Sequence, residues 1–419
     1  VQKPGMVDAH ASKALPDVRE EQSTELLLKT LADAVPLQDA RDAAARRSVL
    51  EELGDICQRW AVAMCARQNH RLPLEAAASL HISGSECLGL NERGQDIDVV
   101  VVVPRAVGLR HFFDSLQPIL QASPRVSGLR PLEGAYVPLL TFDMAPADPT
   151  GGPGAPGPVN VDLMLATLDV DRLSPSLDLH VEGAIALAAD EKSKLALNGP
   201  RATHAILRHL PAESSRAVFL AFLRAVRLWA RRRGLYSNKL GYLGGVNVCI
   251  LAAKVLQMYP TAPLPTLVER FFAVYKDWDW GVPVSLVDGP LLPCDAAMTI
   301  LTPALPPSNS APVVSQGTLK VMQAEMQLAH QQVSASAEPP PPAPRMHART
   351  HTNHEIDHPK ISVISLVRCA SHKPGQDRHA RVSALIETRA LRVAIPIKKR
   401  RDSDLTAITS RGSEGVSSL

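Results

Sequence analysis

Two aspartates placed directly before the most apolar run of the chain constrain its fold more than any other feature. The stretch GSECLGLNERGQDIDVVVVVP spans residues 84–104, and in it Asp96 and Asp98 precede the run Val99 to Val103. The apolar run predicts a strand buried in a sheet. Because residues two apart in a strand point to the same face, we expect the two carboxylates to lie side by side.

Two adjacent carboxylates in a partly buried strand need a positive partner, since aspartate is a poor strand former and like charges repel. A divalent ion that prefers oxygen ligands, Mg²⁺ or Mn²⁺, is the expected compensation. Asp162 is the third candidate ligand, because it interrupts the apolar series VNVDLMLA of another expected strand, residues 159–166. Three such carboxylates predict a site for two metal ions, as used for in-line attack on a phosphate. The alternative is that these acids face water at a sheet edge.

A small glycine and serine segment lies about ten residues before the aspartates. Ser83, Gly84 and Ser85 offer backbone N–H groups and hydroxyls suited to a triphosphate. A Gly-Ser pair alone is weak evidence for such a site. Joined to the D-x-D pair and a third strand aspartate, it becomes the pattern of a nucleotidyltransferase.

The 419 residues are too many for one ordinary core, and a 45% hydrophobic share with 4% aromatic residues favours helices over a sandwich or barrel. The expected class is α/β (α+β). We expect a disordered N-terminus, a mixed-sheet domain whose first helices (23–55) pack on a helical central domain, a Pro-rich linker, and a small α/β module with a basic tail. In order, these are residues 1–22, 23–168, 169–330, 331–358 and 359–419.

Basic charge is concentrated near the end of the sequence. Residues 345–419 hold 14 Lys or Arg against 7 Asp or Glu, although the whole chain carries only +3. This predicts a segment that binds a polyanion, against the alternative of a solvated tail. The six scattered cysteines have no zinc-like spacing and predict reduced, intracellular thiols. No apolar run is long enough to suggest a membrane span.

Several further segments resemble the eukaryotic poly(A) polymerases of the polymerase-beta-like nucleotidyltransferase superfamily, in the same order as in that family. They are LNGPRATHAILRHLP, RAVRLWARRRGLYSNKLGYLGGVNVCILAAKVLQMYP, FFAVYKDWDWGVPVSL and MTILTPALPPSNS. The resemblance runs from about Glu25 to Ser310. It implies a mixed-sheet nucleotidyltransferase domain, a helical central domain and, after the linker, part of a ferredoxin-like RNA-binding domain.

The resemblance also implies roles for individual residues. Asp96, Asp98 and Asp162 would bind the metals as catalytic residues, and Ser83, Gly84 and Ser85 would hold the triphosphate. The remaining nucleotide contacts would come from Asn198, Arg227, Tyr236, Asn238, Gly245 and Val246. Structural roles stay open for some of them: Tyr236 as a packing residue, and the pair Gly244 and Gly245 as a tight helix contact.

The chain departs from the family pattern at several positions. Arg227 stands where the family has a lysine, and Glu92 where it has a small hydroxyl residue near the phosphates. A negative charge there should weaken nucleotide binding unless the side chain turns away. The sequence GSECLG lacks the aromatic and basic residues that follow the serine in the family, and a loop is inserted between Ala145 and Pro158.

We therefore expect a polynucleotide adenylyltransferase that adds AMP units from ATP to RNA 3′ ends with two Mg²⁺ or Mn²⁺ ions. The alternatives are a terminal transferase of another specificity, such as uridylyl, a small-molecule nucleotidyltransferase, and a degenerate RNA-binding member of the family. We also expect a monomer that works with 3′-end processing proteins. The run KKRR (398–401) favours the nucleus, with the cytoplasm as the alternative, and the cluster Arg231 to Arg233 is either an RNA or nucleotide contact or a plain helix end.

Overall fold

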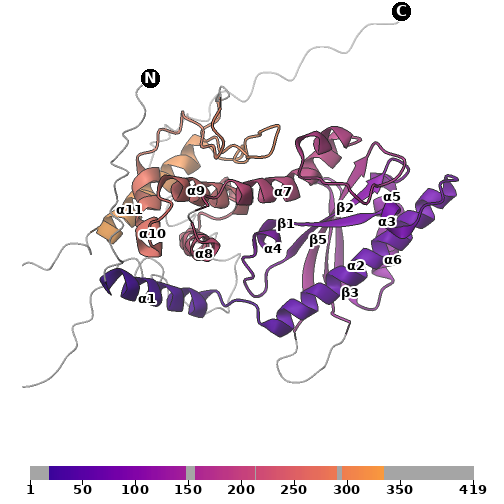
Figure 1. Cartoon of the computed structure of the whole chain (residues 1–419), viewed down its shortest axis with the longest axis horizontal. Coiled ribbons are helices and arrows are strands. Elements are labelled where there is room, and N and C mark those ends of the chain that lie inside the picture. Colours follow the sequence, from indigo (N-terminus) through magenta and orange to yellow (C-terminus); the bar gives the residue numbers. More distant parts are fainter. Residues whose placement is uncertain (1–17, 148–155, 213, 290–294, 335–419) are drawn as a thin grey trace, which may run out of the picture. The chain divides into compact units, whose positions relative to one another are not determined.

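The computed structural model describes residues 18–147, 156–212, 214–289 and 295–334 (Figure 1). The expected module at 359–419, with its KKRR run, lies outside these ranges. So do most of the expected linker, most of the N-terminal segment and the centre of the inserted loop.

A five-stranded mixed sheet carries the first half of the described chain. Its strand order is β1-β2-β5-β4-β3, with β2 and β5 parallel and every other neighbouring pair antiparallel. The strands are β1 (Ser79–Ser83), β2 (Ile97–Pro104), β3 (Val126–Leu132), β4 (Leu139–Met144) and β5 (Val159–Leu168). The mixed sheet confirms the predicted fold class.

The central strand β2 is buried on both faces, which explains its continuous apolar run. Val99, Val101 and Val103 join the core on one face, whereas Val100 and Val102 join a second, smaller core on the other. The face to which Asp98 belongs follows from this alternation: it is the face of the smaller core.

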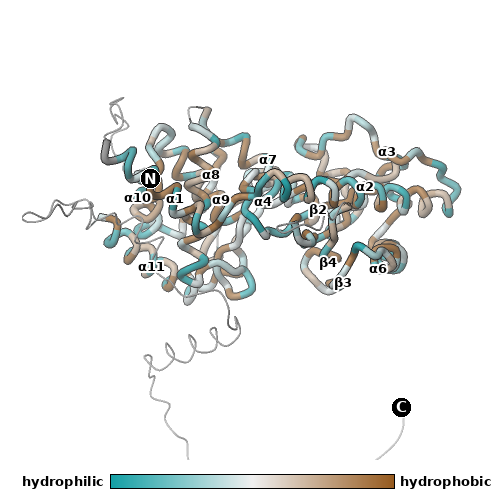
Figure 2. Tube along the Cα trace, turned by 90° about the horizontal axis from the view of Figure 1, so that it is seen from below, coloured by the Kyte–Doolittle hydropathy of each residue, from teal (hydrophilic) through white to brown (hydrophobic). Residues whose placement is uncertain are grey.

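Helices cover both faces of the sheet. On the side of the larger core lie α2 (Ala40–Arg67), α6 (Gln117–Gln121) and the π-helical turn η1 (Phe112–Leu116), with the short helices α3 (Leu74–Ala77) and α5 (Leu109–His111) beside them. The long helix α2 buries one apolar stripe that includes Val49, Leu53 and Trp60. Its alternation of hydrophilic and hydrophobic residues is visible along the tube in Figure 2. Helix α4 (Gly84–Leu88) directly follows β1.

The second half of the described chain is helical. Its helices are α7 (Glu191–Arg208), α8 (Arg216–Arg232), α9 (Gly245–Met258), α10 (Leu264–Lys276) and α11 (Gln316–Ser334), with the 3₁₀ turns η2 (Glu182–Leu187) and η3 (Asn238–Leu240). Helix α7 packs on the smaller core of the sheet through Ala196 and Leu197, whereas α8 to α11 share one large apolar core.

The N-terminal helix α1 (Val18–Ala34) lies against α8 and α10, and its Leu27 and Leu31 belong to the core of the helical region (Figure 1). Helix α2, by contrast, packs on the sheet. The expectation that residues 23–55 pack together on the helical domain is therefore wrong for α2. The reason is that both helices are amphipathic, and periodicity does not indicate which core an apolar stripe joins.

Two further details differ from the sequence expectations. β2 begins at Ile97, so Asp96 precedes the strand instead of lying within it. β3 was not expected, because it is an exposed edge strand that contains Gly128 and Pro131. The four described cysteines are free thiols, as expected, and no helix in the described ranges is long and apolar enough to span a membrane.

Candidate active site

Three aspartates converge at one end of the sheet. Asp98 is the second residue of β2, and its Cα partner in the parallel strand β5 is Asp162. Asp96 lies just before β2, and one carboxylate oxygen of each residue lies within 4.8 Å of those of the other two. The structure therefore brings together the three residues that the sequence pattern singled out.

Two of the aspartates, Asp98 and Asp162, belong to a row of polar residues that crosses all five strands. Ser83 on β1 pairs with Asp98, Asp98 with Asp162, Asp162 with Thr141 on β4, and Thr141 with Arg130 on β3. Directly paired residues on neighbouring strands point to the same face, so the row marks one polar band across the sheet. Thr141 and Arg130 were not found from the sequence, since only the strand register relates them to the aspartates.

The electrostatics of this band favour a cation. Burial, followed by the charges of Asp96 and Asp162, raises the pKa of Asp98 to about 7. Burial and Asp96 also raise the pKa of Asp162, although a hydrogen bond from the Thr141 hydroxyl and the charges of Lys239 and Arg130 oppose the rise. Three carboxylates thus converge here, and the pKa of one of them, Asp98, is raised. Such a set of oxygen donors fits hard divalent cations such as Mg²⁺ or Mn²⁺.

Only glycine fits at position 84. Its φ is +62°, in the left-handed region, and a Cβ atom there would lie 2.1 Å from Oδ2 of Asp98. The backbone of α4 therefore lies so close to the Asp98 carboxylate that a larger residue at position 84 would clash with it. Helix α7 also lies close to the polar band, since a Cβ on its Gly199 would lie 3.2 Å from the Oγ of Ser83. Asn198 is the residue before Gly199 on this helix.

The segment from Tyr236 to Lys239 meets the N-terminus of α9. A Cβ on Gly244 would lie 2.5 Å from Nδ2 of Asn238, and one on Gly245 would lie 3.0 Å from the Tyr236 hydroxyl. The paired glycines thus allow a close approach between α9 and this segment. Because the charge of Lys239 acts on Asp162, the same segment lies near the aspartates. Gly245 is exposed and Val246 is half-buried at the start of α9.

Arg227 lies in a different environment from the one expected of a phosphate ligand. Its side chain is 7% exposed, and its Nη1 lies 3.8 Å from Oε1 of Glu92. Glu92 is 3% exposed and also lies 3.9 Å from Nε of Arg224 and 3.2 Å from Nη1 of Arg231. The carboxylate of Glu92 is thus buried among arginines of α8, which occupy one face of that helix.

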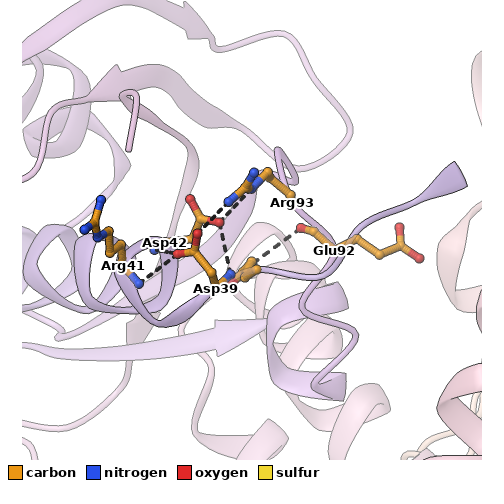
Figure 3. Close-up of polar contacts among 6 residues, drawn as sticks. Asp39, Arg41, Asp42, Glu92 and Arg93 are labelled. Carbon is orange, nitrogen blue, oxygen red and sulfur yellow. Dashed lines mark hydrogen bonds and ion pairs between the residues drawn. The ribbon is translucent and has the colours of Figure 1, made fainter. Parts of the chain in front are cut away.

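Glu92 and its neighbour Arg93 point in opposite directions from the loop between α4 and β2. Figure 3 shows Arg93 beside Asp39 and Asp42 at the start of α2, with Glu92 turned away. Arg93 lies 2.7 Å from each of these two carboxylates. In the same loop, Gln38 N–H donates to the Asn91 carbonyl and Arg93 N–H to the Pro36 carbonyl, at 2.8 and 2.9 Å.

The described chain has a mixed sheet, three converging aspartates, a glycine turn next to Asp98, and a helical region. This arrangement is a nucleotidyltransferase fold. Two family models match the chain: the poly(A) polymerase nucleotidyltransferase domain over residues 9–210 and the poly(A) polymerase central domain over residues 218–339. The chain belongs to the poly(A) polymerase family, as the sequence resemblance predicted.

Curated relatives support this assignment. The chain is 36% identical over 321 residues to the nuclear poly(A) polymerase 1 of Arabidopsis thaliana, covering 73% of this chain and 43% of the relative. It is 33% identical to the poly(A) polymerase of Dictyostelium discoideum, covering 72% of this chain and 37% of the relative. It is 31% identical to poly(A) polymerase pla1 of Schizosaccharomyces pombe, with 74% and 54% covered. The match thus spans about half of these relatives' length or less.

Solved structures share the fold. A mutant of the Cid1 poly(U) polymerase bound to MgATP has a TM-score of 0.55 at 14% identity, covering 76% of this chain and 97% of that chain. Cid1 bound to MgGTP has a TM-score of 0.53 at 14% identity, with 83% and 99% covered. At this identity the likeness concerns the arrangement of the elements alone.

Proposed function

We propose that the protein is a template-independent RNA polymerase that adds AMP units from ATP to the 3′ end of RNA. The observation that carries this proposal is the convergence of Asp96, Asp98 and Asp162 beside the tight Gly84 turn. Membership of the poly(A) polymerase family and the names of the curated relatives support adenylate as the nucleotide and RNA as the acceptor.

The three carboxylates would hold two divalent cations, Mg²⁺ or Mn²⁺. When bound, such ions lower the pKa of an attacking hydroxyl and stabilise the departing pyrophosphate. The residues of the chain would position the reacting groups: the carboxylates would hold the ions, and the backbone at Gly84 and Ser85 would bind the triphosphate. Positioning and charge stabilisation supply most of the acceleration, because phosphoryl transfer needs little covalent help from the protein.

Positive side chains flank the carboxylates and would counter the phosphates. Arg130 and Lys239 both act electrostatically on Asp162 and are exposed. Arg130 lies on β3, at the end of the polar row, and Lys239 lies in η3. We propose that these residues, rather than the buried Arg227, meet phosphate oxygens of RNA or nucleotide. With Glu92 turned into the arginine cluster, its charge faces α8 instead of the substrate.

The name of the Arabidopsis relative supports a nuclear location, and work alongside 3′-end processing proteins is a further part of the proposal. We propose both for this chain. The basic segment from Arg345 onward would add sequence-independent affinity for the RNA backbone.

The test is extension of a labelled oligoribonucleotide by the purified full chain with Mg²⁺ or Mn²⁺ and each of the four nucleotides, alone and in competition. We expect ATP to be incorporated and the Asp98→Asn variant to be inactive while it remains folded. Asp169→Asn is the matched control, because Asp169 lies just after β5 and is 69% exposed. Preference for UTP, or polymerisation by Asp98→Asn, would contradict the proposal.

A further inference from the structure

All three guanidinium nitrogen atoms of Arg46, on α2, donate hydrogen bonds to other residues of the protein. The side chain is 7% exposed. Nε and Nη2 donate to the same oxygen, Oε2 of Glu86, at 2.9 and 2.6 Å. Nη1 donates to the carbonyl of Gln95 at 2.6 Å, and Nη2 reaches the carbonyl of Asp96 at 3.2 Å.

The partners of Arg46 come from the two segments that build the candidate active site. Glu86 lies in α4, directly after the Gly84 and Ser85 turn. Gln95 and Asp96 lie at the end of the loop that leads into β2. Arg46 is 40 residues from the first partner and 49 to 50 residues from the others in sequence, so it joins two segments through a third element.

This geometry requires an arginine. A planar guanidinium can hold a carboxylate and two carbonyls at fixed angles, whereas an ammonium group is a point charge on a flexible stem. The ion pair is largely buried, since Glu86 is 19% exposed, so separation of its members leaves a charge without its partner.

The middle of the loop between α4 and β2 makes ion pairs with other elements. Glu92 faces the arginines of α8, and Arg93 faces Asp39 and Asp42 (Figure 3). These contacts hold the loop three or more residues before Asp96, whereas Arg46 holds the Asp96 carbonyl itself.

We propose that Arg46 is a positioning residue that fixes the Gly84 turn and the metal-binding Asp96 relative to each other, with Glu86 orienting its guanidinium. The inference rests on the proposed function, in which the turn lies against the phosphates and Asp96 binds the metal. A displacement of about 1 Å between such groups is enough to lower a rate about 100-fold.

The experiment compares Arg46→Lys with Arg47→Lys. Arg47 is the next residue of the same helix and is exposed, so the control makes the same chemical change outside the contact. Three experiments are done on the full chain: thermal unfolding, binding of Mn²⁺ alone by electron paramagnetic resonance, and the extension assay, which gives kcat and KM for ATP.

We expect Arg46→Lys to fold, to bind Mn²⁺ about tenfold more weakly or worse, and to lose kcat by a similar or larger factor, because partners that orient metal ligands contribute at this level. KM for ATP should change less than kcat. Arg47→Lys should match the unmodified protein in all three measurements. Glu86→Gln should weaken Mn²⁺ binding in the same direction, and its effect should not add to that of Arg46→Lys.

Two results would overturn the inference. One is native Mn²⁺ affinity and kcat in Arg46→Lys. The other is a lower unfolding temperature with native Mn²⁺ affinity, which would make Arg46 a structural residue only. The Mn²⁺ comparison remains decisive even if the protein extends no RNA, so failure of the proposed function is distinguished from failure of this inference.

Discussion

Asp98 should destabilise the metal-free protein at neutral pH. In the folded chain its carboxyl is largely buried beside Asp96 and Asp162, and its pKa is raised from 3.8 to about 7. Between these two values the folded protein keeps a proton that the unfolded chain has released. Stability therefore falls as the pH rises from about 4, and the loss is complete above about pH 7.

The size of the effect follows from the two pKa values. A rise from 3.8 to about 7 corresponds to about 4 kcal/mol between the protonated and ionised forms. Replacement of Asp98 by asparagine keeps the shape and removes the ionisable group. Asp98→Asn should therefore be more stable than the unmodified protein at pH 8 by up to about 4 kcal/mol, and this advantage should shrink by more than half at pH 5.

Urea unfolding in the presence of a chelator at pH 5 and pH 8 measures this directly. Added Mg²⁺ or Mn²⁺ should stabilise the unmodified protein and narrow the difference, because bound cations take over the compensation of the carboxylates. Asp169→Asn, at an exposed carboxyl, serves as the control and should show no such pH dependence. An Asp98→Asn variant that is no more stable at pH 8, or equally favoured at both pH values, would refute the reasoning.

Four other substitutions have expected outcomes. Gly84→Ala should destabilise the fold by about 1–2 kcal/mol, because alanine is strained at the positive φ of this position. It should also abolish RNA extension, because the new Cβ displaces the Asp98 carboxylate. Full activity would contradict the close contact between residue 84 and Asp98. Glu92→Gln should lower the unfolding free energy by about 3–5 kcal/mol, because it leaves buried arginines without their counter-ion. Arg93→Gln should lower it much less, because the ion pairs of Arg93 lie at the surface. Equal losses in denaturant unfolding would be inconsistent with this. Arg130→Gln should weaken RNA binding several-fold and reduce the slope of log affinity against log salt by about 1 in filter binding; an unchanged slope would exclude a phosphate contact.

The sequence was informative where chemistry and local pattern coincide. The apolar run after Asp98 and the lone acid in the strand of Asp162 predicted two buried strands, and the structure pairs these residues in register. These patterns involve residues only a few positions apart, and hydrophobic periodicity indicates secondary structure at that range. The family resemblance then gave the helical region that follows.

The missed features depend on contacts between distant segments. Whether Glu92 turns away from the phosphates stayed open in the sequence, because its partners lie 132 to 139 residues further along the chain, on α8. Arg46 gave no signal, because one arginine in an amphipathic helix looks like any other until its partners are known. Arg130 and Thr141 join the polar band only through strand register, and β3 itself is too exposed and irregular to be recognised from its pattern.

The placement of α1 has a consequence for the order of folding. Arg224 on α8 donates to the carbonyls of Leu31 and Val35 across 193 and 189 residues. During synthesis at about 5–20 residues per second, the first helix would therefore leave the ribosome some 10–40 seconds before the helices that cover its apolar side. All five strands precede α8 in the chain, so they are synthesised while the apolar side of α1 still lacks the helix that covers it in the folded protein.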